Sequence, residues 1–111
     1  MQRQEVSQSG QQLRAEGKAT SRRSELEVKM DILRVTSEGA NKPTQIMYKA
    51  NLSWVALLGH LKSLTSSGFL TEVEYANRKV YEVSPRGFEL LQNYQKIVSA
   101  VRDIPPEQPA F

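Results

Sequence analysis

The run Ser67-Gly68-Phe69-Leu70-Thr71-Glu72-Val73-Glu74-Tyr75 contains the change of pattern that decides the fold. Before it, Leu57, Leu61 and Leu64 recur at the spacing of a helix that buries one face. Within it, successive residues alternate between two faces, as they do in a strand. Val80-Tyr81-Glu82-Val83 then brings the strand pattern back. The stretch therefore predicts a helix that ends at the glycine, followed by a β-hairpin.

The segments around the second expected strand predict a turn and a last helix. Ala76-Asn77-Arg78-Lys79 is polar and is the expected hairpin turn. Ser84-Pro85 begins the helix, because proline is favoured at the first helical position, and the helix is expected to run to about Asp103. Its apolar residues are Leu90, Leu91, Tyr94, Ile97, Val98 and Val101.

Another helix is expected near the N-terminal end of the folded region. Ser24 is a suitable N-cap, and acidic residues follow it at the positive end of the expected helix. Leu26, Met30 and Leu33 recur at helical spacing and are the expected buried residues. Gly39 is expected to end this helix in a left-handed conformation.

A short helix and a tight turn complete the pattern. The short helix is expected over residues 44–50, with Asn51-Leu52 as the turn and Ser53 as the cap of the next helix. The order is therefore helix, helix, helix, hairpin and long helix. This order predicts an α+β fold that is mainly α: a winged helix-turn-helix with an additional C-terminal helix.

The 111-residue chain has a net charge of +3, which is unevenly distributed. Residues 1–23 are expected to be a flexible basic tail and hold five basic and two acidic residues. The winged helix-turn-helix domain is expected over residues 24–84 and the C-terminal helix over 85–104, and together these hold ten basic and nine acidic residues. Residues 105–111 form a proline-rich tail. Composition alone thus supports nucleic-acid binding only weakly.

The composition argues against several classes of function. The chain has no cysteine, which excludes disulfides, thiol nucleophiles and cysteine-ligated metals. No run approaches the 18–20 or so apolar residues of a membrane span, so a cytoplasmic protein is expected. His60 is the sole histidine and is expected at the edge of the core or in solvent. Glu72 and Glu74 are expected to be surface charges, and Tyr48 and Tyr94 are expected to be packed. No enzymatic activity, metal or cofactor is expected.

Three segments carry a resemblance to a known family. They are Met47-Tyr48-Lys49-Ala50-Asn51-Leu52-Ser53, Ser67-Gly68-Phe69-Leu70 and Tyr81-Glu82-Val83-Ser84-Pro85-Arg86-Gly87-Phe88-Glu89-Leu90-Leu91. Over about residues 24–102 the chain resembles archaeal winged helix-turn-helix DNA-binding regulators. The resemblance implies a transcription regulator that binds double-stranded DNA. It also implies dimerisation, because some members pair through their last helices.

The expected DNA contacts follow from how a helix-turn-helix binds. Its second helix enters the major groove with its N-terminal residues nearest the bases. The candidate contacts on and around that helix and at the hairpin tip are Lys42, Thr44, Gln45, Lys49, Ser53, Trp54, Lys62, Asn77, Arg78 and Lys79. The basic residues of the N-terminal arm that are expected to add backbone or minor-groove contacts are Arg14, Lys18, Arg22 and Arg23. For any single lysine or arginine, a solvated surface charge is the alternative.

The expected recognition helix departs from the family pattern. Val55, Ala56, Leu58 and Gly59 occupy its outward face and offer no hydrogen bonds or charge. Base recognition usually depends on donors and acceptors such as Arg, Asn or Gln. Either the DNA contacts are mostly to phosphate, or this face binds a protein partner. A winged-helix protein–protein interaction module is therefore the alternative function.

The last helix carries the spacing of a coiled-coil seam. Leu90, Tyr94, Ile97 and Val101 follow a 4-3-4 spacing, and Leu91 and Val98 widen the stripe. One small domain does not cover so wide a stripe, so pairing with the same helix of a second copy is expected. Packing on the first helix of the same chain is the alternative.

Overall fold

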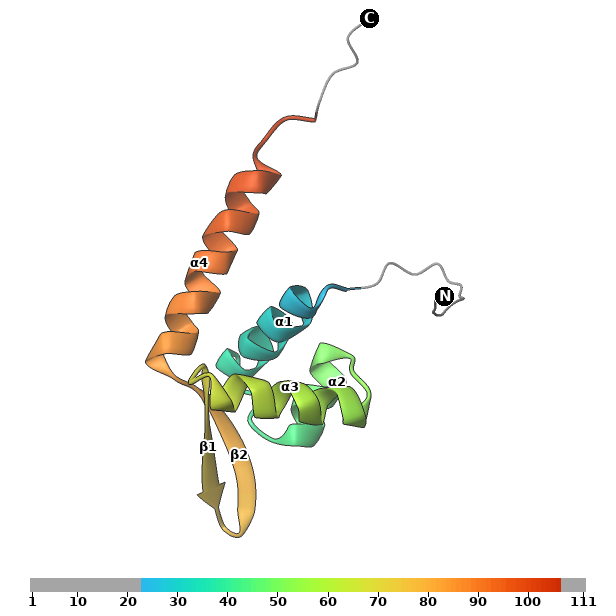
Figure 1. Ribbon diagram of the computed structural model, residues 1–111, viewed down its shortest axis with the longest axis vertical. Helices are drawn as coiled ribbons and strands as arrows, with labels where there is room; N and C mark the ends of the chain where they lie inside the picture. Colours follow the sequence, from blue (N-terminus) through green and yellow to red (C-terminus); the bar gives the residue numbers. More distant parts are fainter. Residues whose placement is uncertain (1–22, 107–111) are drawn as a thin grey trace, which may run out of the picture.

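The computed structural model describes residues 23–106, and its elements follow the predicted order. In Figure 1 the three N-terminal helices lie together, the hairpin projects from one end, and the last helix extends away from the others. The elements are α1 (Glu25–Ser37), α2 (Pro43–Ala50), α3 (Trp54–Ser66), β1 (Leu70–Tyr75), β2 (Arg78–Val83) and α4 (Pro85–Arg102). The winged helix-turn-helix fold with an additional C-terminal helix is confirmed. No helix in this part of the chain has the length and hydropathy to cross a membrane.

Helix α1 begins where predicted but buries a different set of residues. The Ser24 hydroxyl accepts a hydrogen bond from the Glu27 N–H at 3.0 Å, and the Glu27 carboxylate accepts one from the Ser24 N–H at 2.8 Å. The prediction that Leu26 is buried is wrong. Its side chain is 54% exposed, because the first turn of α1 lies at the edge of the core. The buried apolar residues of α1 are Val28, Met30, Ile32, Leu33 and Val35.

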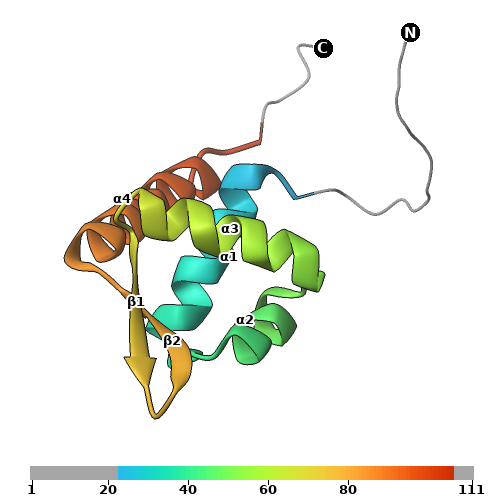
Figure 2. The ribbon, with the colours of Figure 1, turned by 60° about the horizontal axis from the view of Figure 1, so that its bottom comes forward.

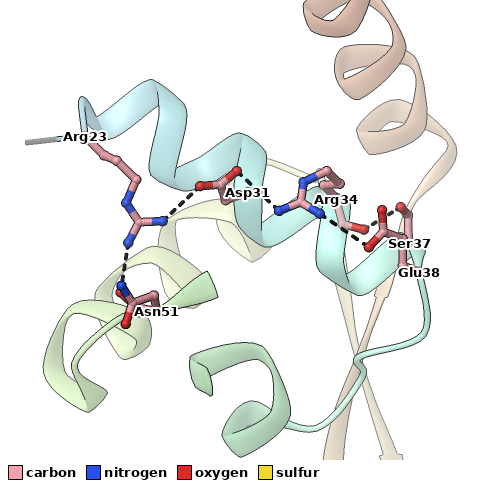
Figure 3. Close-up of polar contacts among 6 residues, drawn as sticks. All are labelled: Arg23, Asp31, Arg34, Ser37, Glu38 and Asn51. Atoms are coloured by element: carbon pink, nitrogen blue, oxygen red, sulfur yellow. Dashed lines mark hydrogen bonds and ion pairs between the residues drawn. The ribbon is translucent and has the colours of Figure 1, made fainter. Parts of the chain in front are cut away.

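Arg23 ties the start of α1 to the turn between α2 and α3 (Figure 3). Its guanidinium lies 2.9 Å from the Asp31 carboxylate and donates at 2.8 Å to the Asn51 carbonyl. Asn51 adopts the left-handed conformation, with φ 58°, as expected for the tight turn. Arg23 was grouped with the basic tail, whereas its side chain is bound to the folded domain.

The core lies where α1, α2 and α3 meet the base of the hairpin. The predicted stripe of α3 is confirmed, since Leu57, Leu61 and Leu64 are all buried. The largest fully buried side chains come from four different elements and are Ile32, Leu33, Ile46, Leu57 and Leu70. Leu91 from α4 also joins this core, so the start of the last helix packs on its own domain.

The hairpin turn is shorter than predicted. Ala76 and Asn77 alone form it, with φ 52° and 64°, and two consecutive positive φ angles match the twist of a two-residue hairpin. Arg78 and Lys79, expected in the turn, instead begin β2, where they are paired opposite Tyr75 and Glu74. The two basic residues are therefore held on a strand rather than in a loop.

Ser84 joins the hairpin to α4. Its hydroxyl donates to the Gly68 carbonyl at 2.6 Å and accepts from the Gly87 N–H at 3.0 Å, so it caps α4, and Pro85 is the first residue of the helix, as predicted. Its N–H donates to the Phe69 carbonyl at 3.1 Å. Gly68, the predicted end of α3, has a φ of 84°. These contacts fix the direction in which α4 leaves the domain.

Candidate nucleic-acid interface

Residues from three segments meet around a shallow hollow at the N-terminal ends of α2 and α3. The hollow has a volume of about 330 Å³. We call it the basic hollow, and its lining residues are Lys42, Pro43, Thr44, Trp54, Arg78 and Lys79. Five of the ten expected DNA contacts are thus brought together from positions that lie up to 37 residues apart in the sequence.

A backbone hydrogen bond places these segments beside one another. The Tyr81 N–H donates to the Asn41 carbonyl at 2.8 Å, which joins β2 to the loop before α2. Lys42 follows directly and is the N-cap of α2, where its N–H donates to the Gln45 side-chain carbonyl at 3.3 Å. Gln45 therefore has a structural role at this helix terminus, and its side-chain oxygen is already engaged.

Ser53 places Trp54 at the border of the basic hollow. The Ser53 hydroxyl accepts from the Ala56 N–H at 3.2 Å and caps α3, so Trp54 is the first residue of the helix. The Trp54 side chain is 44% exposed, which leaves part of the indole open to a partner.

Charge is distributed unevenly over the folded part of the chain. Residues 39–81 hold five basic and two acidic side chains, whereas residues 24–38 hold four acidic and two basic ones. In the described part of the chain, no carboxylate is paired with Lys42, Lys62 or Arg78. The excess of positive charge therefore belongs to the segment that forms α2, α3 and the hairpin.

Glu72 forms an ion pair with one of these basic residues, Lys79. Its carboxylate lies 3.4 Å from the Lys79 ammonium and accepts a hydrogen bond from the Tyr81 hydroxyl at 3.1 Å. Burial raises the pKa of the Tyr81 hydroxyl, and the adjacent Glu72 carboxylate raises it further. Lys79 is thus the least available of the expected phosphate-binding residues on the hairpin.

The outward face of α3 is apolar, as the sequence indicated. Val55 is 80% exposed and Leu58 is 46% exposed. At Gly59 a Cβ atom would meet nothing within 4 Å, so the face is open at that point. Figure 2 shows α3 in front of α1, with the hairpin to one side and α2 to the other.

His60 lies on the side of α3 that is turned toward α1. Its Nδ1 accepts a hydrogen bond from the Lys29 ammonium at 3.2 Å, and Lys29 also lies 3.3 Å from the Glu25 carboxylate. Burial lowers the pKa of His60, the positive charge of Lys29 lowers it further, and Glu25 opposes this. His60 is half-buried at the edge of the core, as predicted. Within residues 23–106, no three His, Asp or Glu side chains are grouped to hold a metal ion.

The other expected contacts lie around the basic hollow rather than in it. Lys62 lines a separate groove of about 200 Å³ between α3 and the hairpin, together with Leu58 and Tyr81. Lys49 lies exposed near the end of α2, and Asn77 forms the hairpin tip. Of the N-terminal arm, Arg14, Lys18 and Arg22 lie outside the described residues.

Three exposed aromatic residues, Tyr48, Tyr75 and Phe88, were not among the expected functional residues. Tyr48 was expected to be packed but is 78% exposed, and Tyr75, at the end of β1, is 74% exposed. Tyr75 lies directly opposite Arg78 in the hairpin. The signal available in the sequence was its position immediately before the turn.

The expected dimerisation stripe of α4 divides into two parts. Leu90 and Tyr94 are half-buried against the core of their own chain. Ile97 and Val101 are 62% and 60% exposed, and Ile104, which the sequence analysis did not include, is 65% exposed. Val98 is half-buried between these parts. The uncovered part of this stripe is therefore in the C-terminal half of the helix, which projects beyond the other elements in Figure 1, while Phe88, outside the stripe, is 45% exposed near the N-terminal end of α4.

Comparison with known proteins gives consistent similarities. The model of a family described as winged helix-turn-helix matches residues 22–101. An uncharacterized protein of Methanocaldococcus jannaschii, MJ0287, is 30% identical over 84 residues, which are 76% of this chain and 82% of that protein. The structure of Sso10a-2, a DNA-binding protein from Sulfolobus solfataricus, superposes on this chain with a TM-score of 0.62 and a sequence identity of 28%. The superposed region is 73% of this chain and 83% of Sso10a-2. The transcriptional regulator BldR from the same organism shares the fold, with a TM-score of 0.62 at 15% identity over 68% of this chain and 57% of its own.

Proposed function

Because the chain belongs to the winged helix-turn-helix family, we propose that it binds double-stranded DNA as a non-enzymatic transcription regulator. In this arrangement α3 lies in the major groove and the hairpin contacts the flanking backbone. The observation that carries the proposal is the basic hollow, which gathers expected contacts from α2, α3 and β2 around Trp54. The similarity to Sso10a-2, a DNA-binding protein, supports it.

The proposed contacts are mainly to phosphate. Lys42 and Arg78 both line the basic hollow, and neither has a carboxylate partner in the described part of the chain. Each phosphate that a cation neutralises releases counterions, which stabilises the complex and makes binding depend on salt. Lys49 and Lys62 extend the basic surface along α2 and α3.

We further propose that the protein acts as a homodimer. The exposed residues Ile97 and Val101 are four positions apart and therefore lie on one side of α4, and the exposed Ile104 follows just after the C-cap Asp103. Pairing with the same surface of a second chain removes them from water. Two recognition helices are then held at a fixed spacing, as in other dimeric helix-turn-helix proteins.

The similar proteins favour an archaeal regulator that works on chromosomal DNA in the cytoplasm. Both MJ0287 and Sso10a-2 come from archaea and each is covered over more than four-fifths of its length. The alternative function, a protein-interaction module, is favoured by the exposure of Val55 and Leu58. The basic residues around that face favour DNA instead.

The proposal is tested by titrating a labelled duplex of mixed sequence and following its fluorescence anisotropy. With about four phosphate contacts per protomer, and so about eight in the proposed dimer, raising the salt from about 50 to 200 mM weakens binding about 10⁴-fold. Arg78→Gln and Lys42→Gln are each expected to reduce the slope of log K against log salt by about 1.8, because each substitution removes one contact from both protomers of the proposed dimer.

Lys96→Gln is the matched control, because it removes the same charge from the polar side of α4. It is expected to leave the slope unchanged. Absence of binding at 50 mM salt, or an equal loss of slope in the control, contradicts the proposal.

A further inference from the structure

The outward face of α3 is a nearly continuous apolar strip. Val55, Leu58, Gly59 and Lys62 lie at positions i, i+3, i+4 and i+7 of the helix, so they share one side. Two of them are exposed aliphatic side chains, and Gly59 leaves the backbone open to close approach. From Val55 to Gly59 the strip therefore offers no side-chain hydrogen bond to another surface, and Lys62 ends it with a positive charge.

The one polar side chain between Trp54 and Lys62 faces elsewhere. His60 is directed toward α1, where its Nδ1 accepts a hydrogen bond from Lys29. The donors and acceptors on the edges of guanine, cytosine and adenine thus find no partner side chain on this stretch of α3. The thymine methyl group is the one feature of the major groove that an aliphatic side chain can recognise.

The geometry points to Val55 and Leu58 as specificity-determining residues that contact the C5-methyl groups of pyrimidines in the major groove. This inference rests on the DNA-binding function proposed above. Three residues advance a helix by about 4.5 Å. Successive bases on one strand are about 3.4 Å apart. The two side chains are therefore spaced to reach methyl groups on neighbouring base pairs.

The charges around the strip favour DNA over a protein as its occupant. Lys62 lies at the C-terminal end of the strip, and Lys42 and Arg78 lie beside Trp54 at its N-terminal end. An apolar strip bordered by cations that have no carboxylate partner within residues 23–106 fits a polyanion whose groove presents methyl groups.

The test compares duplexes that differ only in the methyl group. An alternating adenine–thymine duplex is titrated beside the same duplex with deoxyuridine in place of thymidine. Each contacted methyl group is expected to strengthen binding about threefold to fivefold, which corresponds to burial of one methyl-sized group. A guanine–cytosine duplex is expected to gain affinity in the same range when its cytosines carry 5-methyl groups, because that methyl group lies at the same groove edge.

Variants assign the effect to the two side chains. Val55→Ser, at a residue that is 80% exposed, and Val55→Ser/Leu58→Ser are expected to bring the thymine-to-uracil affinity ratio toward one while the affinity for the uracil duplex is retained. Leu26→Ser is the control, because Leu26 is an exposed leucine of α1, 54% accessible, outside the strip. Thermal unfolding of each variant verifies that it is folded.

The outcomes separate this inference from the proposed function. Equal affinity of the wild-type protein for the thymine and uracil duplexes overturns the inference and leaves DNA binding intact. Loss of affinity for both duplexes to the same degree in the serine variants also overturns it. Absence of binding to every duplex overturns both, and the strip is then assigned to a protein partner.

Discussion

Gly87 in α4 lies directly against the backbone of Phe69, so that a Cβ atom on residue 87 would overlap the Phe69 carbonyl oxygen. The same Cβ would come within 2.8 Å of the Val83 side chain. The carbonyl is fixed in place because it also accepts the Ser84 N–H at 3.1 Å. Close packing of α4 on the hairpin base therefore depends on the missing side chain.

Gly87→Ala is expected to destabilise the protein by about 2 kcal/mol, because neither the carbonyl nor Val83 can move without disturbing the end of the hairpin. This is the reverse of the usual effect in a helix, where alanine is favoured over glycine by about 1 kcal/mol. Urea unfolding followed by circular dichroism measures the change.

Gly59→Ala is the matched control for this prediction. Gly59 also lies inside a helix, but a Cβ there meets nothing within 4 Å and its φ is not in the positive range. It is expected to stabilise the protein by about 0.5–1 kcal/mol. Equal effects of the two substitutions would contradict the packing of α4 against Phe69.

Arg23→Gln is expected to lower the free energy of unfolding by about 1 kcal/mol. The substitution removes an ion pair with Asp31 and a hydrogen bond to the Asn51 carbonyl, which join segments 28 residues apart. The effect is modest because both charged side chains are about one-third exposed. Thermal or urea unfolding measures it.

Arg34→Gln provides the comparison, since Arg34 also pairs with Asp31, at 3.7 Å, and with Glu38, at 3.4 Å. Both of these partners lie on or next to the same helix, so no distant segment is released. A change within about 0.5 kcal/mol is expected. If Arg34→Gln lowers the free energy of unfolding more than Arg23→Gln does, the hydrogen bond from Arg23 to the Asn51 carbonyl adds nothing to stability.

His60 makes stability depend on pH. Because burial and Lys29 lower its pKa in the folded chain, the unfolded chain binds more protons between that lowered value and about 6.5. The stabilising contribution is therefore complete above about pH 6.5 and is lost as the pH falls through the folded-state pKa. His60 is the sole histidine, so His60→Gln is expected to flatten the stability profile across this range.

Melting temperatures recorded between pH 5 and 8 check this prediction. A wild-type protein that becomes more stable than His60→Gln on acidification from pH 7 would contradict it. Lys29→Met is expected to reduce the dependence of stability on pH, because it removes the positive charge that is the second cause of the lowered His60 pKa.

Features set by neighbouring residues were predictable from the sequence. Ser24 and Ser53 were expected to cap helices, and each accepts the hydrogen bond of a cap. A cap depends on residues within three positions, so the local sequence is enough to identify it. The spacing of Leu57, Leu61 and Leu64 was likewise enough to predict the buried face of α3, because it depends on residues within one helix.

Features set by distant segments were not predictable. Leu26 and Tyr48 have suitable spacing for burial, yet their exposure depends on which elements cover each helix end. Lys42 and Arg78 line the same hollow because a backbone hydrogen bond joins Tyr81 to Asn41, which is 40 residues away in the sequence. Such a contact is visible only after the chain has folded.

Val101→Glu is expected to weaken self-association of the chain about 100-fold or more. Val101 is 60% exposed in the single chain, so the charge is tolerated there. In the proposed dimer the same position is buried against a second copy, where an unpaired carboxylate costs about 3–5 kcal/mol. Sedimentation equilibrium measures the dissociation constant. Gln95→Glu introduces the same charge on the polar side of α4 and is expected to leave association unchanged. If both variants associate as tightly as the wild type, α4 does not form the interface, because a buried seam at Val101 is incompatible with an unpaired charge.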